Sequence, residues 1–367
     1  QELEEWRHLH QMIFRLAKER GIDTYLLPFN IFVSKEFAAA YKVAEPNTYP
    51  RSNTRGTTSP IVRDYVRASI GQVLAEYPDL TGLGINLGEG MGGMSTDERL
   101  AYVNDTYLGA IREADRPVKL MWSVNSVNTK EWNSSDGDPS VDERRLRTLI
   151  EGIDYVDGPV IVNFKFNWSH ALSTPKLVQI HGGNFSDTYS TPQPRNYKVS
   201  WIARNEDVFA LRWGVPSFIR RHVQTNGTPA YVGGYTVGSE NYIPARDYFT
   251  KSVDHKQWAY AFERQWLFYK LWGRLLYNPQ TPDKVFADEF VNRYGRQGRN
   301  LLQAYERASG TSLKLASLFY SQWDHTLYSE GMLWLDGRTM QYIGADALIR
   351  QKVLDPDYVS VSDYVAA

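Results

Sequence analysis

A single carboxylate, Glu89, stands where a strand pattern gives way to a run of glycines. Alternating apolar residues at 83, 85 and 87 predict a buried strand, and glycines at 88, 90, 92 and 93 then allow a turn, because glycine tolerates positive φ. Ser95 and Thr96, followed by two acids, are typical of a helix start. Ligands bind at the carboxyl ends of strands in parallel α/β folds, so Glu89 is a candidate acid catalyst. The alternative is a tight turn whose acid only faces water.

The same glycines also fit the spacing of a dinucleotide-binding fingerprint, Gly88-x-Gly90-x-x-Gly93. Glu89 disfavours this interpretation, because it would put a negative charge where a helix N-terminus should bind a pyrophosphate. The next predicted strand, at 118–124, is followed by Ser126 and Val127 rather than by an acid that could hold a ribose. We therefore expect no nucleotide and no other cofactor.

Polar, charged and aromatic residues follow the other predicted strands, and their types suit carbohydrate binding. Aromatic rings stack on the apolar faces of sugars, and an arginine pairs bidentately with a carboxylate, which favours a uronic or sulfated sugar as ligand. Each tryptophan could instead belong to the core, and Arg212 could instead neutralise a neighbouring acid. The candidate substrate-binding residues are Asn125, Trp122, Lys165, Trp168, His170, Arg212 and Trp213.

The elements that must position these residues alternate between strand and helix, which favours a parallel sheet. Strands are expected at 24–32, 83–87, 118–124, 159–166, 207–213 and 230–237, with a doubtful one at 175–180. Polar residues gathered at strand ends are typical of the mouth of a (β/α)8 (TIM) barrel. Six strands leave such a barrel open. We expect its first strands to be missing from this numbering, and strand 24–32 to lack a neighbour on one side.

Helices are predicted before the first strand and throughout the part of the chain that follows the barrel segment. An amphipathic helix at 2–20 opens the sequence, with Leu3, Trp6, Leu9, Ile13 and Leu16 at helical spacing. Beyond residue 250, helices are predicted at 257–277, 282–294 and 299–309. The sequence thus predicts a barrel domain over 1–250 and a helical C-terminal domain over 251–367.

Composition narrows the class of ligand. The 367 residues carry a net charge of −1, which gives no indication of nucleic-acid binding, and no run of 18 apolar residues suggests a membrane span. Cysteine is absent, which excludes thiolate chemistry. The seven histidines show only one loose pair, His170 and His181, so no metal is expected. Aromatic residues are abundant, at 14% of the chain.

Two blocks resemble the α-glucuronidases, which are glycoside hydrolases with a (β/α)8 barrel and a helical C-terminal region. The first is residues 78–90, PDLTGLGINLGEG, and the second is residues 266–279, WLFYKLWGRLLYNP, with ADEF at 287–290. The resemblance implies that Glu89 is the general acid and that strand 24–32 is the third of the barrel. Gly238-Ser239-Glu240 is similar to the end of that family's last barrel strand.

Glycoside hydrolysis needs a second carboxyl group besides that of Glu89. Where the family carries its base carboxylates, this chain reads Asn167-Trp168-Ser169-His170 and His181-Gly182-Gly183. Glu240 is the best candidate at a strand end, and Asp187 and Asp207 are weaker ones. If Glu89 and Glu240 end the fourth and eighth strands, they face each other across the barrel, which favours the wider spacing of inverting enzymes. The alternative for Glu240 is a helix-capping acid.

The sequence therefore predicts a glycoside hydrolase that acts on an acidic plant or algal polysaccharide or oligosaccharide, with Glu89 and Glu240 as catalytic residues. The alternative is a non-catalytic carbohydrate-binding protein on a degenerate glycosidase barrel. The expected partner is the carbohydrate alone, without nucleic acid or membrane, and a homodimer through the helical domain is a further hypothesis. A periplasmic or secreted bacterial protein is expected.

Overall fold

A computed structural model describes ten segments of the chain: residues 2–28, 33–43, 59–86, 95–123, 139–167, 179–180, 183–184, 187–204, 215–238 and 266–316. The chain forms two compact units. The first comprises Gln1–Phe164 and Ser186–Ser200, and the second comprises Lys165–Phe185 and Trp201–Ala367. The predicted boundary near residue 250 stays a prediction.

Six strands form a curled parallel sheet that corresponds to part of a barrel. Neighbouring strands in space are also successive in the chain, apart from a small hairpin between the fourth and fifth. The order is β1 (Tyr25–Leu26), β2 (Gly82–Asn86), β3 (Lys119–Ser123), β4 (Val160–Asn167), β7 (Tyr197–Arg204) and β8 (Val232–Gly238). The strand alternation expected from the sequence is thus present.

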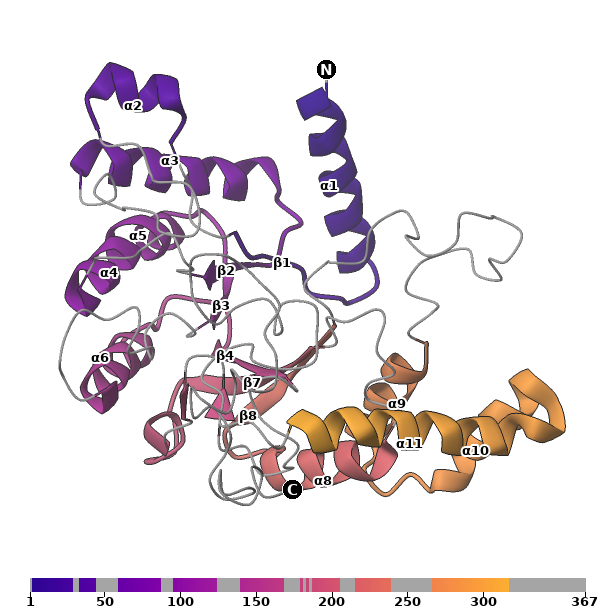
Figure 1. The fold of residues 1–367 in the computed structure, drawn as a ribbon. Helices are drawn as coiled ribbons and strands as arrows, with labels where there is room; N and C mark the ends of the chain where they lie inside the picture. The colour runs from indigo at the N-terminus through magenta and orange to yellow at the C-terminus, as the bar shows by residue number, and fades with distance from the viewer. Residues whose placement is uncertain are drawn as a thin grey trace, which may run out of the picture. The chain divides into compact units, whose positions relative to one another are not determined.

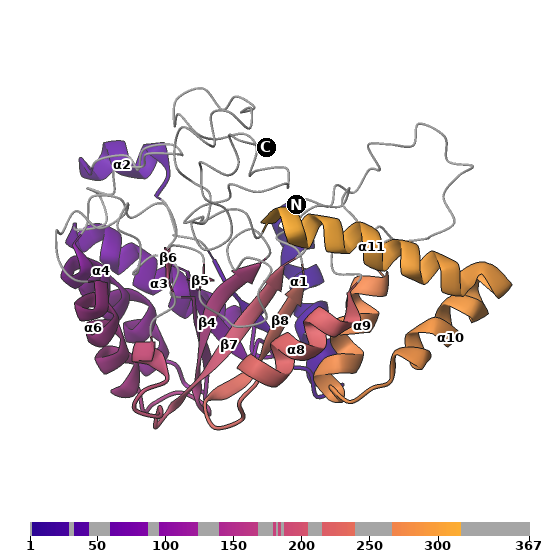
Figure 2. The same ribbon diagram turned by 60° about the horizontal axis from the view of Figure 1, so that its bottom comes forward.

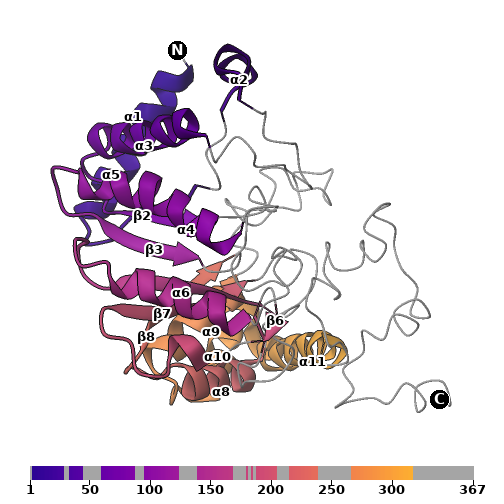
Figure 3. The ribbon, with the colours of Figure 1, turned by 90° about the vertical axis from the view of Figure 1, so that its left-hand side faces the viewer.

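In the first unit, helices form a layer along one side of β2 and β3 (Figures 1 and 3). Alternate strand residues point into this layer. Leu83, Ile85, Leu120, Trp122 and Val162 are at most 2% exposed. The covering helices are α3 (Pro60–Glu76), α4 (Thr96–Val103), which runs through a π-helical turn (Asn104–Leu108) into α5 (Gly109–Arg112), and α6 (Pro139–Glu151).

Helix α4 begins where the sequence predicts it. The Ser95 hydroxyl accepts a hydrogen bond from the Glu98 amide, and the Glu98 carboxylate accepts one from the Ser95 amide at 2.8 Å. This capping box satisfies two amides that the helix itself leaves free. Hydrogen bonds from the Ser95 amide and hydroxyl to this carboxylate hold the pKa of Glu98 below its usual value. Helix α4 therefore starts ten residues after the end of β2, beyond the segment that contains Glu89.

Strand β1 lies at one edge of the sheet, and among the described residues its only strand partner is β2. The prediction of an open edge at the first strand is thus confirmed within this part of the chain. The strand is shorter than predicted, because only Tyr25–Leu26 of 24–32 pairs, and residues 29–32 lie outside the described segments. Helices α1 (Glu2–Lys18) and α2 (Lys35–Tyr41) flank β1 in the chain.

The fifth strand of the sheet differs from the prediction. Strand β7 is Tyr197–Arg204, whereas the sequence analysis placed a strand at 207–213, which lies outside the described residues. Tyr197, Val199, Trp201 and Ala203 alternate along β7 and are at most 1% exposed. Their burial explains why this stretch is a strand. The doubtful strand at 175–180 is represented by β5 (Gln179–Ile180), which pairs antiparallel with β6 (Gly183–Asn184).

In the second unit, α8 (Pro216–Asn226) and α9 (Trp266–Tyr277) lie beside β8 (Figure 2). Arg220 of α8 donates hydrogen bonds to the Pro279 and Thr281 carbonyls at 3.0 and 2.9 Å, which fixes the turn after α9. Two further helices follow, α10 (Asp283–Tyr294) and α11 (Gly298–Ala316). The helices predicted at 282–294 and 299–309 are both present, the second one longer than expected. No described helix has the length and apolar character that a membrane span requires.

Buried His222 links α8, β8 and α9 in the core of this unit. Its ring lies 5.8 Å from that of Tyr235 and 6.0 Å from that of Trp272, centroid to centroid. The imidazole is 0% exposed, and burial lowers its pKa from 6.5 to about 3. His222 is therefore neutral at pH 7 and serves as a packing residue.

We expect His222 to make the stability of the protein depend on pH. The unfolded chain binds a proton at this position below about pH 6.5, but the folded protein does so only near pH 3. The free energy of unfolding should therefore fall as pH drops through this window, by up to about 1.4 kcal/mol per pH unit. Urea unfolding at pH 7, 6, 5 and 4 measures the slope. His222→Gln should flatten it, whereas His8→Gln, at an exposed position, should not.

Candidate functional site

A row of polar residues crosses three adjacent strands at their carboxyl ends. Asn86 of β2 is in register with Ser123 of β3, and Ser123 is in register with Asn163 of β4. Ser123 and Asn163 are each 2% exposed. Adjacent parallel strands are about 4.8 Å apart, so the row places three hydrogen-bonding side chains next to one another. We call Asn86, Ser123 and Asn163 the polar row.

The polar row lies on the face of the sheet opposite to the helix layer. In each strand the residue just before a row member is fully buried on the other face: Ile85, Trp122 and Val162 are each 0% exposed. Successive side chains of a strand point to opposite faces. The packing of the apolar residues under the helices therefore forces the row onto the other side, which is the interior face of a barrel.

Two glycines precede Asn86 on this interior face. A Cβ at Gly82 would lie 2.5 Å from the Tyr25 ring, and a Cβ at Gly84 would overlap the Leu27 side chain. Glycine is needed at both positions because side chains from the β1 segment cross over β2 here. Apolar side chains thus occupy the middle of the interior face, and the polar row stands at the carboxyl end.

Asn163 has an acceptor that the described protein leaves unused. Its Nδ2 lies 3.8 Å from the Met121 sulfur, and its buried Oδ1 has no hydrogen-bond partner among the described residues. Buried acceptors are nearly always satisfied by protein or water. The Oδ1 atom can therefore accept a hydrogen bond from a water or a ligand hydroxyl at the floor of this site.

The opposite ends of the strands carry a structural ion pair instead. Lys119, at the start of β3, donates a hydrogen bond from Nζ to Asp23 at 2.5 Å. This bond raises the pKa of the lysine. The pair ties the segment before β1 to β3. A structural ion pair at the amino ends and polar side chains at the carboxyl ends are a division also found in barrel folds.

Of the seven candidate substrate-binding residues, Trp122 is the one whose side chain the structure describes. It lies in β3 on the helix-covered face and is 0% exposed. The alternative role in the core therefore holds for Trp122, and its prediction as a sugar-stacking residue is wrong. The signal was available in the sequence, because Leu120 and Trp122 alternate within the strand. The polar row itself was not singled out from the sequence.

The remaining candidates follow the described strand ends or lie farther along the chain. Lys165 belongs to β4, but its side chain lies outside the description. Arg212 and Trp213 were predicted at the end of a strand, whereas β7 ends at Arg204, eight residues earlier than Arg212. The candidates outside the described residues are Glu89, Asn125, Trp168, His170, Arg212, Trp213 and Glu240.

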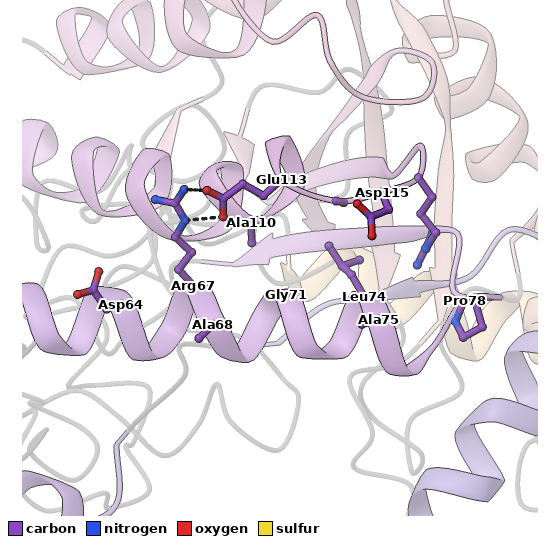
Figure 4. A pocket seen from close by; sticks show the side chains of 12 residues that line it. Asp64, Arg67, Ala68, Gly71, Leu74, Ala75, Pro78, Ala110, Glu113 and Asp115 are labelled. Atoms are coloured by element: carbon purple, nitrogen blue, oxygen red, sulfur yellow. Dashed lines mark hydrogen bonds and ion pairs between the residues drawn. The ribbon is translucent and has the colours of Figure 1, made fainter.

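A groove of about 660 Å³ lies elsewhere, on the helix layer (Figure 4). Its floor contains small residues of α3 and α5, including Ala68, Gly71 and Ala110. Arg67 and Glu113 form a bidentate ion pair at its rim, with Nε to Oε2 at 2.9 Å. The groove contains none of the predicted site residues. Within the described segments, no group of three or more acids and histidines could hold a metal ion.

Comparisons with known proteins establish the class of fold. No family model matches the sequence, and no curated protein matches it either. Seven chains among the solved structures do match. One is described as a GH138 enzyme targeting pectin rhamnogalacturonan II, with a TM-score of 0.59 and 19% sequence identity. The match covers 87% of the present chain. The chain thus has a fold found in glycoside hydrolases, and it spans 36% of that larger enzyme.

We expect Asn163→Leu to weaken carbohydrate binding without loss of stability. The amide makes only a weak contact in the described protein, so an apolar side chain of similar size should change the unfolding free energy by less than about 1 kcal/mol. Loss of one hydrogen bond should weaken the binding of a carbohydrate ligand by up to about tenfold. Calorimetric titration and thermal unfolding measure the two effects.

Asn196→Leu is the matched control. The Asn196 amide donates to the carbonyls of Ile150, Glu151 and Ile153 at the end of α6, at 2.9 to 3.2 Å. Its loss should destabilise the protein by about 1–3 kcal/mol and leave binding by the folded protein unchanged. Unchanged binding in Asn163→Leu would remove Asn163 from the site.

Proposed function

We propose that this chain forms the catalytic region of a glycoside hydrolase that cleaves an acidic plant or algal polysaccharide. The observation that carries the proposal is the polar row at the carboxyl ends of a curled parallel sheet, in a fold shared with a glycoside hydrolase. Active sites of barrel enzymes are built on this end of the strands. Glu89 follows the end of β2 by three residues, which suits a loop carboxylate above the row.

Glu89 is the proposed general acid, and Glu240 is the proposed second carboxylate. Glu240 follows β8 by two residues. Strands β2 and β8 are four places apart in the sheet order, which is halfway around an eight-stranded barrel. Opposed carboxylates favour the wider separation of roughly 6.5–9.5 Å, with room for a water, and hence inversion at the anomeric carbon.

An acidic sugar is the proposed substrate. The GH138 enzyme of similar fold targets pectin rhamnogalacturonan II, and pectin is an acidic polysaccharide. Arg212 and Lys165 are the cations proposed to bind its carboxylates, and an arginine does so with two parallel hydrogen bonds. Trp168 and Trp213 would stack on sugar rings, while Asn125 and His170 would bind hydroxyls.

Finer features of the proposal come from the resemblance to α-glucuronidases. They include cleavage at a glucuronic acid, a (β/α)8 barrel that lacks its first strands in this numbering, and a helical domain over 251–367 that forms a homodimer. A periplasmic or secreted bacterial enzyme would meet such polysaccharides directly. No cofactor is needed, because two carboxyl groups suffice for the chemistry.

A non-catalytic carbohydrate-binding protein is the second candidate. It is favoured by the segments Asn167-Trp168-Ser169-His170 and His181-Gly182-Gly183, which stand where α-glucuronidases carry base carboxylates. The same aromatic and cationic residues would then bind the polysaccharide without cleaving it. Release of reducing ends from pectin by the wild-type protein distinguishes the two candidates.

Glu89→Gln should abolish hydrolysis while the fold and sugar binding persist. The amide keeps the shape of the carboxyl group but cannot donate the proton, which contributes on the order of 10²–10⁴-fold to the rate. Aryl glycosides with good leaving groups need little protonation and should lose less activity. Initial rates on both substrate kinds test this, with Glu98→Gln in the α4 capping box as the control that keeps activity. Equal losses on both substrates would refute the acid role.

Arg212→Ala should weaken the binding of acidic oligosaccharides much more than that of neutral ones. A hydrogen bond to a charged group is worth roughly 1.5–3 kcal/mol, so each bond lost should weaken binding by about ten- to a hundredfold. Isothermal titration with galacturonic and neutral oligosaccharides measures the difference. Arg221→Ala, on the exposed side of α8, should change neither affinity. The same loss for both sugar kinds would make Arg212 structural.

A further inference from the structure

Backbone hydrogen bonds show which residues of β4 and β7, adjacent strands of the sheet, lie side by side (Figure 2). In the register pairs of β1 with β2 and of β2 with β3, an amide donates to the carbonyl one residue before its partner. This offset is the general pattern of parallel strands. The Val160 amide donates to the Asn196 carbonyl at 3.1 Å. Val160 is therefore in register with Tyr197.

The same register places Ser200 of β7 beside Asn163 of β4, three residues further along both strands. The residues just before them, Val162 and Val199, are each 0% exposed. Successive side chains of a strand point to opposite faces, so Asn163 and Ser200 both lie on the interior face. Ser200 is 4% exposed and belongs to the same compact unit as Asn163. It continues the line of the polar row onto a fourth strand.

Neither side chain of this pair is satisfied within the described part of the chain. The Asn163 amide nitrogen lies 3.8 Å from the Met121 sulfur of β3, and the buried Oδ1 has no hydrogen-bond partner there. The Ser200 hydroxyl makes no hydrogen bond to any described residue. Buried polar groups are nearly always satisfied by protein, water or a ligand. Two neighbouring side chains, each more than nine-tenths buried, can therefore bind the same molecule.

The atoms of the pair decide which chemical group can bind. Asn163 Oδ1 is an acceptor, so its partner must bring a hydrogen. A sugar carboxylate has only acceptor atoms at neutral pH and would leave Oδ1 unsatisfied. A sugar hydroxyl can donate to Oδ1, and a second hydroxyl can donate to the Ser200 hydroxyl or accept from it. The whole line of Asn86, Ser123, Asn163 and Ser200 contains no charged side chain that could pair with a carboxylate.

We infer that Asn163 and Ser200 form a subsite that binds one sugar unit through two neighbouring hydroxyl groups, and not through a carboxylate. Adjacent parallel strands are about 4.8 Å apart, so both side chains can reach hydroxyls of a single ring. The inference rests on the proposed function, and it adds a neutral subsite to the cations proposed there for the acidic groups.

Ser200→Ala tests the inference without removing a hydrogen bond from the described protein. The midpoint of thermal unfolding should move by less than about 2 °C. The affinity for galacturonic acid oligosaccharides should fall about three- to tenfold, as expected for one lost hydrogen bond. Ser69→Ala is the matched control, because the Ser69 hydroxyl donates to the Tyr65 carbonyl within α3 at 2.8 Å, and it should leave the affinity unchanged. Unchanged affinity in Ser200→Ala would overturn the inference.

A double variant tests whether the two side chains bind the same sugar unit. Asn163→Leu combined with Ser200→Ala should weaken binding by less than the product of the two single losses, because either substitution alone disturbs the ring that both side chains contact. Calorimetric titration of the wild type, the two single variants and the double variant measures this coupling. Losses that simply multiply would place the two side chains in separate subsites and overturn the inference.

The form of the ligand separates hydroxyl binding from carboxylate binding. Reduction of the carboxyl groups of the oligosaccharide to alcohols leaves its ring hydroxyls in place, so Ser200→Ala should weaken the binding of both forms by the same factor. A loss confined to the acidic form would assign the pair to a carboxylate and overturn the inference. If the wild type binds neither form and releases no reducing ends, the proposed function fails and the inference fails with it. If the wild type binds and Ser200→Ala binds equally well, the inference alone fails.

Discussion

The parallel register of β2, β3 and β4 under the helix layer is the constraint on which the rest of the described site depends. Ile85, Trp122 and Val162 are neighbours in this ladder and are all fully buried. Complete burial of such side chains contributes roughly 1.5–3 kcal/mol each. A shift of one residue in any strand would exchange an apolar side chain for a polar one on the covered face. The hydrophobic core therefore fixes the position of the polar row.

On the interior face of β2, apolar contacts in the middle of the strand give way to the polar row at its carboxyl end. Gly82 and Gly84 allow the side chains of Tyr25 and Leu27 to lie across β2, so the middle of this face is closed by apolar contacts. The polar residue Asn86 comes just beyond them in the strand. Packing positions and a polar position thus follow one another on the same face of one strand.

Much of the fold was predictable because it depends on local patterns. The strands β2, β3, β4 and β8 alternate or run apolar between clear breaks, and α4 has its capping box in the sequence. Strand β7 was missed because the sequence analysis placed the strand on the apolar run at 207–213 instead, which lies outside the described residues. The polar row depends on the register between strands far apart in the chain. Single strand patterns contain no information on that register, so the polar row was not predicted.

The polar row nevertheless restricts where the predicted catalytic loop can reach. Glu89 comes three positions after Asn86, and Asn125 comes two positions after Ser123. A chain extends at most about 3.6 Å per residue, so the Cα of Glu89 lies within about 11 Å of that of Asn86. The Cα of Asn125 lies within roughly 7 Å of that of Ser123 by the same measure. Since Asn86 and Ser123 are register partners on adjacent strands, the chain leaves β2 and β3 at neighbouring points of the same sheet end. Chain length alone thus limits how far Glu89 and Asn125 can lie from the polar row, which is compatible with the proposed site.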